Sequence, residues 1–321
     1  MTVPTALALI GDIGATNARF ALLAPSGEQS VVRTYSVDDF ASLADAIEAY
    51  LTDEGSAIKP ARAALAVASP ISGDRVTLTN HAWTFSIEAL KRRLSFSELD
   101  VINDFAATAL ALPRLAPHDV VQIGSGAPTR DAPCGIIGPG TGLGVSALVP
   151  SPKGPIAVAG EGGHITMAAA TAAEAAVLEI MRRRYNHASA ERVLSGPGLV
   201  NLYTALCELA GVPAAPFTPA QITSERIWRE DRRAEEATQM FCAMLGTVAG
   251  NLALTLGAQA GLYLAGGIVP RILPFFKQSE FRARFEAKGR FRDYLSAIPT
   301  YVIVRALPGL LGVSSLLNPS G

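Results

Sequence analysis

Two short segments of the chain follow the same plan and constrain the fold more than any other feature. Residues 10–16 (IGDIGAT) precede the run 21–25 (ALLAP), and residues 137–144 (IGPGTGLG) precede the run 147–150 (ALVP). Each predicts a strand, a turn of small residues and a returning strand, because glycine between apolar runs is typical of tight turns. The repeat therefore predicts two related halves, and if the halves face each other both turns lie in one central cleft.

The spacing of apolar residues predicts an α/β protein. The chain has 321 residues, which is long for one compact core and sufficient for two domains. Apolar runs of strand length occur at 29–35 and 61–68, and residues 38–51 have helical spacing. The stretch that follows Pro113, through Pro117 and the segment 124–133 rich in glycine, proline and serine, is expected at the boundary between the two domains.

Composition and charge exclude several classes of partner. Charged residues make up 17% of the chain and the formal net charge is -1, so no basic excess points to nucleic acid or to an anionic membrane. The cysteines are too widely spaced for a zinc clip and too few for a disulfide framework. The N-terminus lacks the basic residues and cleavage site of a secretion signal. We therefore expect a cytoplasmic protein with reduced thiols.

One uncharged segment, residues 240–270, is long enough to span a bilayer. Asn251 and Gln259 interrupt it, and glycines at 266 and 267 break its regular structure. Apolar runs with internal polar residues and glycines are usually core segments. We expect a buried helix followed by a buried strand, and no membrane partner.

The two glycine turns are candidate phosphate sites, because small residues let backbone amides approach a phosphate. In the first, Thr16 adds a hydroxyl donor and Asp12 can hold Mg²⁺ directly or through water. The chain has no Walker-type loop, and Leu143 replaces the last glycine of a dinucleotide fingerprint in the second turn. An ordinary hairpin turn is the alternative for each. The candidate residues are Gly11, Asp12, Ile13, Gly14, Ala15, Thr16, Gly140, Thr141 and Gly142.

Asn103 and Asp104 are the candidate reaction centre. The short strand 99–102 delivers them to its carboxyl end, which is where open α/β sheets bind their ligands. Phosphoryl transfer needs an acceptor hydroxyl held in line and a group that accepts its proton, and an aspartate can do both. The alternative is a helix N-cap, since residues 105–112 have helical spacing and Asn and Asp both favour that position.

Three further side chains could read an array of sugar hydroxyls. Glu161 and His164 lie on either side of a glycine pair that we expect to be flexible, and Glu191 follows in the segment 190–198. Carboxylates and imidazoles recognise neighbouring hydroxyls by paired hydrogen bonds. Alternatively, Glu191 pairs with Arg192 at the surface and His164 is a core histidine. A metal role for His164 is weaker, because no second histidine or cysteine accompanies it.

The segment 264–270 contains Gly266 and Gly267 after an apolar strand. A turn of this composition lets backbone pack against a flat ligand such as adenine. Packing of a helix on the sheet is the alternative.

Taken together and in this order, the motifs resemble those of the bacterial glucokinase family in the hexokinase/actin-like ATPase superfamily. The resemblance covers almost the whole chain, and each motif is weak alone while the ordered set is specific. The segments that carry it are residues 10–19, 79–83, 102–105, 140–144, 160–164, 191–203, 265–271 and 308–312.

The resemblance implies a two-lobed actin-like ATPase (ribonuclease H-like) fold that binds ATP and glucose in the interlobe cleft. It implies a small domain at 1–113 completed by about 303–321, a large domain at 114–302, dependence on Mg²⁺ and a homodimer. By position, Asp104 is the base for the glucose 6-hydroxyl. Asn103, Glu161, His164 and Glu191 hold the other hydroxyls, while 11–16 and 140–142 cradle the phosphates.

The sequence departs from the family at Ala15, where members often have a second glycine, so backbone approach to the phosphates is in doubt there. It also lacks the cysteine-rich zinc loop of a related sugar kinase and repressor family. A kinase for another hexose, a non-catalytic sugar sensor and an actin-like filament ATPase remain alternatives. The pair Asn103–Asp104 and both turns disfavour the sensor, and the sugar-reading side chains disfavour the filament protein.

Overall fold

The computed structural model describes residues 7–55 and 59–317 and confirms the α/β class. The chain divides into two compact units. Unit 1 comprises Met1–Leu115 and Arg305–Gly321, and unit 2 comprises Ala116–Val304. Each unit has its own sheet and its own hydrophobic core.

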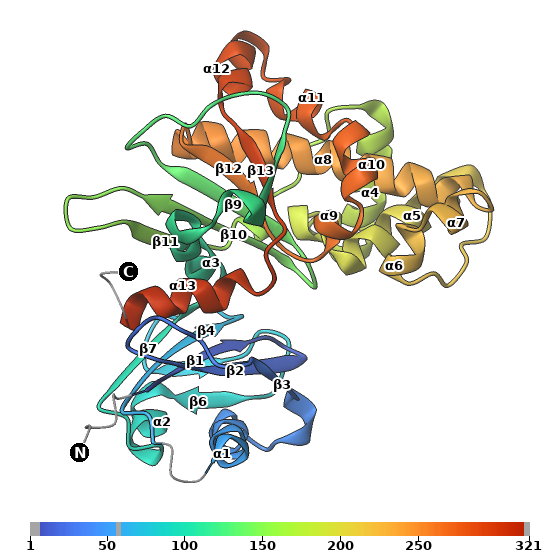
Figure 1. The fold of residues 1–321 in the computed structure, drawn as a ribbon. Helices are drawn as coiled ribbons and strands as arrows, with labels where there is room; N and C mark the ends of the chain where they lie inside the picture. Colours follow the sequence, from blue (N-terminus) through green and yellow to red (C-terminus); the bar gives the residue numbers. More distant parts are fainter. Residues whose placement is uncertain (1–6, 56–58, 318–321) are drawn as a thin grey trace. The chain divides into compact units, whose positions relative to one another are not determined.

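Unit 1 is a five-stranded sheet with helices on both faces (Figure 1). The strand order is β3-β2-β1-β4-β7, in which β1 pairs antiparallel with β2 and parallel with β4. One face packs against α1 and α2, and the other against α3 and α13. A short hairpin, β5–β6, is added beside the sheet. The elements are β1 (Ala8–Ile13), β2 (Asn17–Leu23), β3 (Arg33–Ser36), β4 (Arg62–Val67), β5 (Arg75–Thr77), β6 (Thr84–Ser86), β7 (Glu98–Asn103), α1 (Leu43–Glu54), α2 (Ile87–Arg93), α3 (Asp104–Ala111) and α13 (Pro308–Leu317).

Unit 2 is a six-stranded sheet whose core lies against the long helix α8. The strand order is β11-β10-β9-β12-β13-β8. Its strands are β8 (Val120–Ile123), β9 (Cys134–Pro139), β10 (Leu143–Val149), β11 (Ile156–Gly160), β12 (Gly261–Leu264) and β13 (Thr300–Ile303). Its helices are α4 (Ala172–Tyr185), α5 (Gly196–Ala210), α6 (Pro219–Ile222), α7 (Glu225–Trp228), α8 (Arg232–Leu256), α9 (Ile268–Arg271), α10 (Leu273–Gln278), α11 (Phe281–Glu286) and α12 (Arg292–Ala297).

Short 3₁₀ helices connect several of these elements. They are η1 (Val37–Asp39), η2 (Leu112–Arg114), η3 (Pro117–Asp119), η4 (Gly162–His164), η5 (Ala190–Arg192) and η6 (Gly289–Phe291).

The two sheets share one topology, which confirms the relation between the halves that the sequence repeat predicts. In unit 1, β1, β2 and β3 form an antiparallel meander, and β4 and β7 extend the sheet in parallel on the other side of β1. In unit 2, β9, β10 and β11 form the same meander, and β12 and β13 extend it in parallel beside β9. Each glycine turn connects the first two strands of its meander, β1 to β2 and β9 to β10. That both turns lie in one cleft stays a prediction.

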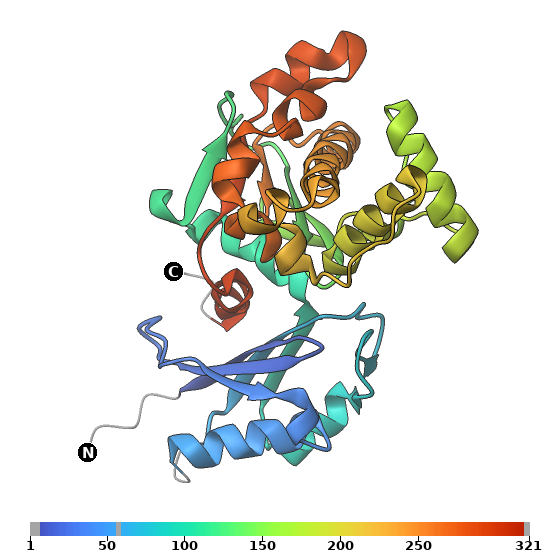
Figure 2. The same ribbon diagram turned by 90° about the vertical axis from the view of Figure 1, so that its right-hand side faces the viewer.

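The uncharged segment forms a core helix and a buried strand, as expected. Helix α8 is the one helix among the described residues that is long and apolar enough to span a membrane, and 56% of its most apolar stretch is buried in the protein. Its glycines allow α11 to cross closely, since a Cβ at Gly246 would lie 2.2 Å from the carbonyl oxygen of Phe281. Figure 2 shows α8 almost end-on, beside the sheet of unit 2.

Three sequence-based boundaries were wrong. The first strand continues through Gly11 and Asp12, so its turn begins at Gly14. The strand expected at 29–35 begins at Arg33, and Gln29 makes only an isolated bridge to Leu23. The helix expected at 38–51 is split into η1 and α1, with Ser42 as the N-cap of α1.

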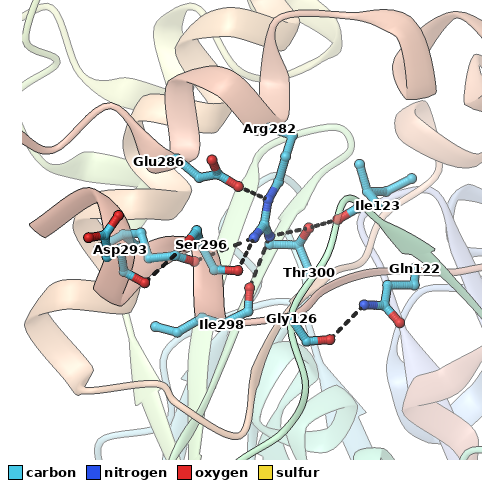
Figure 3. A network of polar contacts seen from close by, with 10 residues as sticks. Gln122, Ile123, Gly126, Arg282, Glu286, Asp293, Ser296, Ile298 and Thr300 are labelled. Atoms are coloured by element: carbon cyan, nitrogen blue, oxygen red, sulfur yellow. Dashed lines mark hydrogen bonds and ion pairs between the residues drawn. The ribbon is translucent and has the colours of Figure 1, made fainter.

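The chain passes from unit 1 to unit 2 at Leu115–Ala116, near the start of the stretch expected at the boundary. The later part of that stretch, 124–133, connects β8 to β9 within unit 2. Figure 3 shows the carbonyl oxygens to which Arg282 donates, and the side chain of Gln122 donating to the carbonyl oxygen of Gly126 in this segment. Arg282 lies against Gly124, where a Cβ would be 2.7 Å from Cδ of Arg282, and donates to the carbonyl oxygens of Ser296 and Ile298, both at 2.9 Å. The glycines of this segment therefore serve close packing rather than linker flexibility.

Candidate functional site

The turn of unit 1 presents unpaired backbone donors. The amide of Gly14 donates to the carbonyl oxygen of Asn17 at 2.9 Å and closes the turn. The amides of Ala15 and Thr16 donate no hydrogen bond to any described residue. Successive free amides in a turn form a concavity that binds anions. The exposed hydroxyl of Thr16 adds a further donor at the same place.

Gly11 and Ile13 serve the core rather than this turn. Both lie in β1 between β2 and β4, and the side chain of Ile13 is fully buried. A Cβ at Gly11 would lie 2.7 Å from Cδ2 of Leu65, so glycine is needed here for packing. Within this segment, residues 14–16 form the turn itself, whereas Gly11 and Ile13 lie in the strand.

Ala15 fits the turn without strain. Its φ lies outside the positive range that favours glycine, since the positive-φ residues other than glycine in the described part of the chain are Ser95, Asp131, Asn186 and Leu307. An alanine adopts such a backbone conformation freely. The departure from the family at this position leaves the turn geometry intact.

Asp12 is the carboxylate nearest to this turn along the chain. It stands opposite Arg19 in the β1–β2 register, with 3.5 Å between Oδ2 of Asp12 and Nη1 of Arg19. Burial raises the pKa of Asp12 above its ordinary value, and the charge and hydrogen bond of Arg19 offset part of that rise. The side chain is 21% exposed, so a ligand can reach it.

The donor set at Asp12 fits a magnesium ion that arrives with a nucleotide. Mg²⁺ usually takes one or two carboxylates together with phosphate oxygens and water. Among residues 7–55 and 59–317, no cluster of three or more His, Cys, Asp or Glu side chains could hold a metal. A single carboxylate is sufficient for a nucleotide-bound Mg²⁺ and too little for a resident metal.

The turn of unit 2 has the same character. The amide of Gly140 donates to the carbonyl oxygen of Gly142 at 2.8 Å, and Gly196 at the start of α5 donates to the carbonyl oxygen of Gly140 at 2.8 Å. The amides of Thr141 and Gly142 have no acceptor in the described part of the chain. A second pair of free amides is thus placed beside the N-terminus of a 15-residue helix, which favours negative charge.

Gly266 and Gly267 lie beside this turn. Strands β9 and β12 are parallel neighbours, so residues that follow them meet at one edge of the sheet. Gly266 has φ +79°, and a Cβ there would lie 2.3 Å from the carbonyl oxygen of Pro139, one residue before the turn. Both glycines are exposed. That they receive a planar ring stays a prediction.

The candidate sugar-reading residues of unit 2 lie on two adjacent segments. Glu161 precedes η4 and His164 ends it, while Glu191 lies in η5. The two segments are joined by the amide of Ala190, which donates to the carbonyl oxygen of Ile165 at 2.9 Å, and by a bridge between Thr166 and Ser189. Glu161 and His164 are exposed and Glu191 is half-buried. His164 is thus not a core histidine.

The glycine pair between Glu161 and His164 is not flexible, contrary to the prediction. A Cβ at Gly163 would lie 2.2 Å from the carbonyl oxygen of Leu143, and one at Gly162 would lie 2.8 Å from Cγ1 of Val145. The pair packs flat on β10 and needs glycine for that close approach. This contact fixes Glu161 and His164 beside the strand that begins at the phosphate turn.

Asn103 and Asp104 are positioned by the junction of β7 and α3. Asn103 is the N-cap of α3, and its Oδ1 accepts from the amides of Phe105 at 2.9 Å and Ala106 at 3.1 Å. Its Nδ2 donates to the carbonyl oxygen of Ser69 at 3.3 Å, which leaves one N–H for a ligand. Asp104 is the first residue of α3.

Two contacts within the site were not found by sequence reasoning. Ser69 holds Asn103 through its carbonyl oxygen, and its hydroxyl donates to the carbonyl oxygen of Thr77 in β5. The carboxylate of Glu191 accepts from the amide of Leu143 at 2.8 Å, so this residue also supports the phosphate turn. Neither contact leaves a local signal, because the partners are far apart in the sequence.

Known proteins resemble this chain over almost its whole length. The family model for glucokinase matches residues 9–320. The chain is 51% identical to a glucokinase of Nitrobacter hamburgensis over 312 residues, which cover 97% of each protein. It is 50% identical to a glucokinase of Chromobacterium violaceum over 309 residues, which cover 96% of this chain and 88% of that protein.

Among solved structures, a glucokinase from an Antarctic psychrotroph superposes with a TM-score of 0.86 at 38% identity. The superposition covers 98% of this chain and 99% of that chain. The similarity in sequence and in fold thus extends over both units.

Proposed function

The chain belongs to the glucokinase family and is a glucose kinase, and on this premise we propose how its residues transfer the γ-phosphoryl group of ATP to the 6-hydroxyl of glucose. The products are glucose 6-phosphate and ADP. The proposal assigns a role to each of the two glycine turns, to Asp12 and to the side chains at the ends of β7 and β11.

The two turns bind the phosphates of ATP. What supports this assignment is that each turn has two successive amides without an acceptor among the described residues, at Ala15–Thr16 and at Thr141–Gly142. Backbone amides cost no reorganisation when a phosphate arrives, because the turn already holds them in place. The adenine ring lies on the backbone surface at Gly266 and Gly267.

Asp12 holds the magnesium ion, directly or through water. When bound, the ion neutralises charge on the phosphate oxygens of the transferring group. Arg19 keeps the carboxylate of Asp12 in place when no nucleotide is bound, because the two side chains face each other across the β1–β2 hairpin.

Asp104 accepts the proton of the 6-hydroxyl as the oxygen attacks the γ-phosphorus. The remaining hydroxyls are held by Asn103 through its spare N–H, and by Glu161, His164 and Glu191. These side chains suit the task because a site built to hydrogen-bond a substrate hydroxyl rejects an analogue that lacks it, by about 10⁴-fold or more.

We also propose the two-lobed actin-like arrangement, in which glucose and ATP bind between the units and closure expels water. Water is the competing acceptor, so its exclusion favours transfer to the sugar. The repeated sheet topology supports this arrangement. The enzyme is proposed to act in the cytoplasm as a homodimer. Light scattering on the purified protein measures its molar mass and so tests the dimer.

An assay that couples ADP release to a spectroscopic signal tests the sugar substrate, and with a variant it tests the assignment of Asp104. It is run with glucose, mannose, fructose, N-acetylglucosamine and no sugar. We expect the highest kcat/KM with glucose, and ADP release that depends on sugar.

The variant Asp104→Ala should lose at least about 100-fold in kcat, because a positioned base contributes about 10² to 10⁴ in rate. Its fold should persist, since Asn103 remains as the cap of α3. Circular dichroism and thermal unfolding check this. Turnover near that of the unmodified enzyme would show that another group is the base.

A further inference from the structure

Glu191 contacts the phosphate turn directly, although the proposed function uses it only as a sugar ligand. We propose that Glu191 is a positioning residue that links the two subsites of unit 2. One carboxylate oxygen fixes the phosphate turn, and the other accepts from a sugar hydroxyl. The sugar half of this inference rests on the proposed function, whereas the contact with the turn does not.

The contact depends on the small size of Gly142. Oε2 of Glu191 accepts from the amide of Leu143 at 2.8 Å, and a Cβ at Gly142 would lie 2.5 Å from the same oxygen. The carboxylate therefore occupies the space that a side chain at Gly142 would fill. Because Leu143 directly follows the free amides of Thr141 and Gly142, this bond sets the direction in which those amides point.

A second connection closes the link on the other side of the turn. The hydroxyl of Ser195 donates to the carbonyl oxygen of Glu191 at 2.8 Å and accepts from the amide of Gly198 at 3.0 Å, as the N-cap of α5. The amide of Gly196 donates to the carbonyl oxygen of Gly140 at 2.8 Å. The segment 191–198 thus bonds to the turn at Leu143 and at Gly140, and its own end forms the start of helix α5.

The carboxylate retains capacity for a ligand. Only Oε2 takes part in a hydrogen bond among the described residues, and no described cation pairs with Glu191. Arg192, the ion-pair partner considered from the sequence, instead stacks on the ring of Tyr185 at 4.0 Å. A carboxylate has about four acceptor positions, so Oε1 can accept from a sugar hydroxyl while Oε2 keeps its bond.

The consequence is a coupling between sugar and nucleotide. A sugar bound to Oε1 restricts the carboxylate, and the restricted carboxylate holds the amide of Leu143 in one orientation. The turn then loses less freedom when phosphate binds, so glucose should raise nucleotide affinity. By linkage, nucleotide should raise glucose affinity by the same factor.

Calorimetric titration of the full chain tests the link with the magnesium complex of AMPPNP as the nucleotide probe. Each variant is titrated with the probe in the absence of sugar, and with glucose in the absence of nucleotide. Glu191→Ala should lose about tenfold in probe affinity without sugar, since it removes a hydrogen bond to a charged acceptor. Glu191→Gln keeps an oxygen that can accept from Leu143, so its probe affinity should stay within about twofold.

Glu161→Gln is the matched control for the sugar subsite, because the described residues include no contact of its side chain with the turn. It should weaken glucose binding and leave probe affinity unchanged. Gly142→Ala is the second route to the same effect, since its methyl group displaces the carboxylate while Glu191 is still present. Gly140→Ala is its control, because nothing lies within 4 Å of a Cβ there. Gly142→Ala should weaken both ligands, and Gly140→Ala should leave glucose affinity unchanged.

The outcomes separate this inference from the proposed function. Unchanged probe affinity in Glu191→Ala and in Gly142→Ala would overturn the positioning role, and weakened glucose binding in Glu191→Ala would still support the sugar role. Loss of probe affinity with unchanged glucose affinity in Glu191→Ala would overturn the sugar role and with it the coupling. Thermal unfolding of each variant shows whether a loss of affinity reflects a loss of fold.

Discussion

Single glycines shape this site for two different physical reasons, which are a positive φ and close packing against a neighbouring segment. Gly266 combines a positive φ of +79° with the close approach of its Cα to the carbonyl oxygen of Pro139. Gly267 has neither constraint, because the atom nearest to a Cβ there is Nη2 of Arg271 at 3.9 Å. The two neighbours therefore form a natural pair for comparison.

We expect Gly266→Ala to lower the free energy of unfolding by about 2 to 4 kcal/mol, since a Cβ 2.3 Å from a carbonyl oxygen forces the backbone apart. Its KM for ATP should rise as well. Gly267→Ala should change the unfolding free energy by less than about 1 kcal/mol. Urea denaturation followed by circular dichroism measures both. Equal stability of the two variants would contradict the assignment of strain to Gly266.

At the scale of elements, the crossing of α3 and α13 places the proposed base. A Cβ at Gly312 of α13 would lie 1.7 Å from the carbonyl oxygen of Ala107 in α3, so the two helices touch backbone to backbone. Asp104 is the first residue of α3. Any shift that separates the helices therefore displaces the carboxylate that accepts the proton.

Gly312→Ala should accordingly destabilise unit 1 by about 3 kcal/mol and lower kcat, although alanine favours a helix by about 1 kcal/mol over glycine. Gly309→Ala in the same helix is the control, because the atom nearest to a Cβ there is Oδ1 of Asp12 at 3.9 Å. That variant should be neutral or slightly stabilised. Unfolding in urea and steady-state kinetics give the two readouts. A stabilised Gly312→Ala variant would show that the crossing tolerates a side chain.

A buried ion pair joins α4 to α11 in unit 2. Glu174 is 2% exposed, and its Oε1 accepts from Nη1 of Arg284 at 2.6 Å. Burial raises the pKa of Glu174, but the hydrogen bonds from Arg284 and from the amide of Ala170 outweigh burial and lower the pKa overall. The folded state therefore prefers the carboxylate. This stabilisation is complete above the pKa of an unfolded glutamate, about 4.3, and is lost as pH falls through the lower folded pKa.

Glu174→Gln should cost about 3 kcal/mol at pH 7, because it leaves Arg284 buried beside a neutral amide. The difference from the unmodified protein should shrink as the pH falls below about 4. Glu179→Gln on the same helix is the control, since Glu179 and Arg182 are exposed and such pairs contribute less than about 1 kcal/mol. Urea denaturation across pH measures both variants. A difference that stays constant down to pH 3 would contradict the role of the charge.

Sequence reasoning predicted elements well where the signal is local. The two hairpins, the strand before Asn103 and the core helix within residues 240–270 follow from apolar runs and from the glycine and proline residues that bound them. Sequence reasoning failed where a glycine is needed for close packing against a segment that is distant in the sequence. Gly11, Gly124 and Gly163 were interpreted as turn, linker and flexible joint, yet each packs against a residue of another segment. A glycine in a sequence does not reveal whether it serves a positive φ or a close contact.

The same limit explains which parts of the candidate site could be predicted. The capping role of Asn103 was predictable, since a polar residue between a strand and a helix is a local pattern. The bond between Glu191 and the amide of Leu143 was not, because it spans 48 residues. Proximity of that kind is decided by how strands and helices pack, and no local pattern encodes it.

At the scale of the whole molecule, unit 1 is assembled from both ends of the chain. Leu310, Val313 and Leu317 of α13 are buried against the face of the sheet that includes Ile10 and Ala64. The carbonyl oxygen of Leu317 accepts from Nη1 of Arg62 at 3.0 Å. Unit 2 lies between these two parts in the sequence and has a core of its own. Unit 1 therefore cannot complete its core until residues 308–317 are made.

A chain that ends at Val304 should lose the fold of unit 1 and keep that of unit 2. Without α13, one face of the β1–β4 pair is exposed to water, and buried apolar side chains contribute about 1.5 to 3 kcal/mol each. Differential scanning calorimetry should then show a single remaining transition, and glucose phosphorylation should be abolished. The full-length variant Leu310→Ala provides a graded version, with an expected cost of about 3 kcal/mol confined to the transition of unit 1. If the shortened chain kept the heat of unfolding of the complete protein, α13 would be a peripheral helix, and the core of unit 1 would have to be closed by the first 115 residues alone.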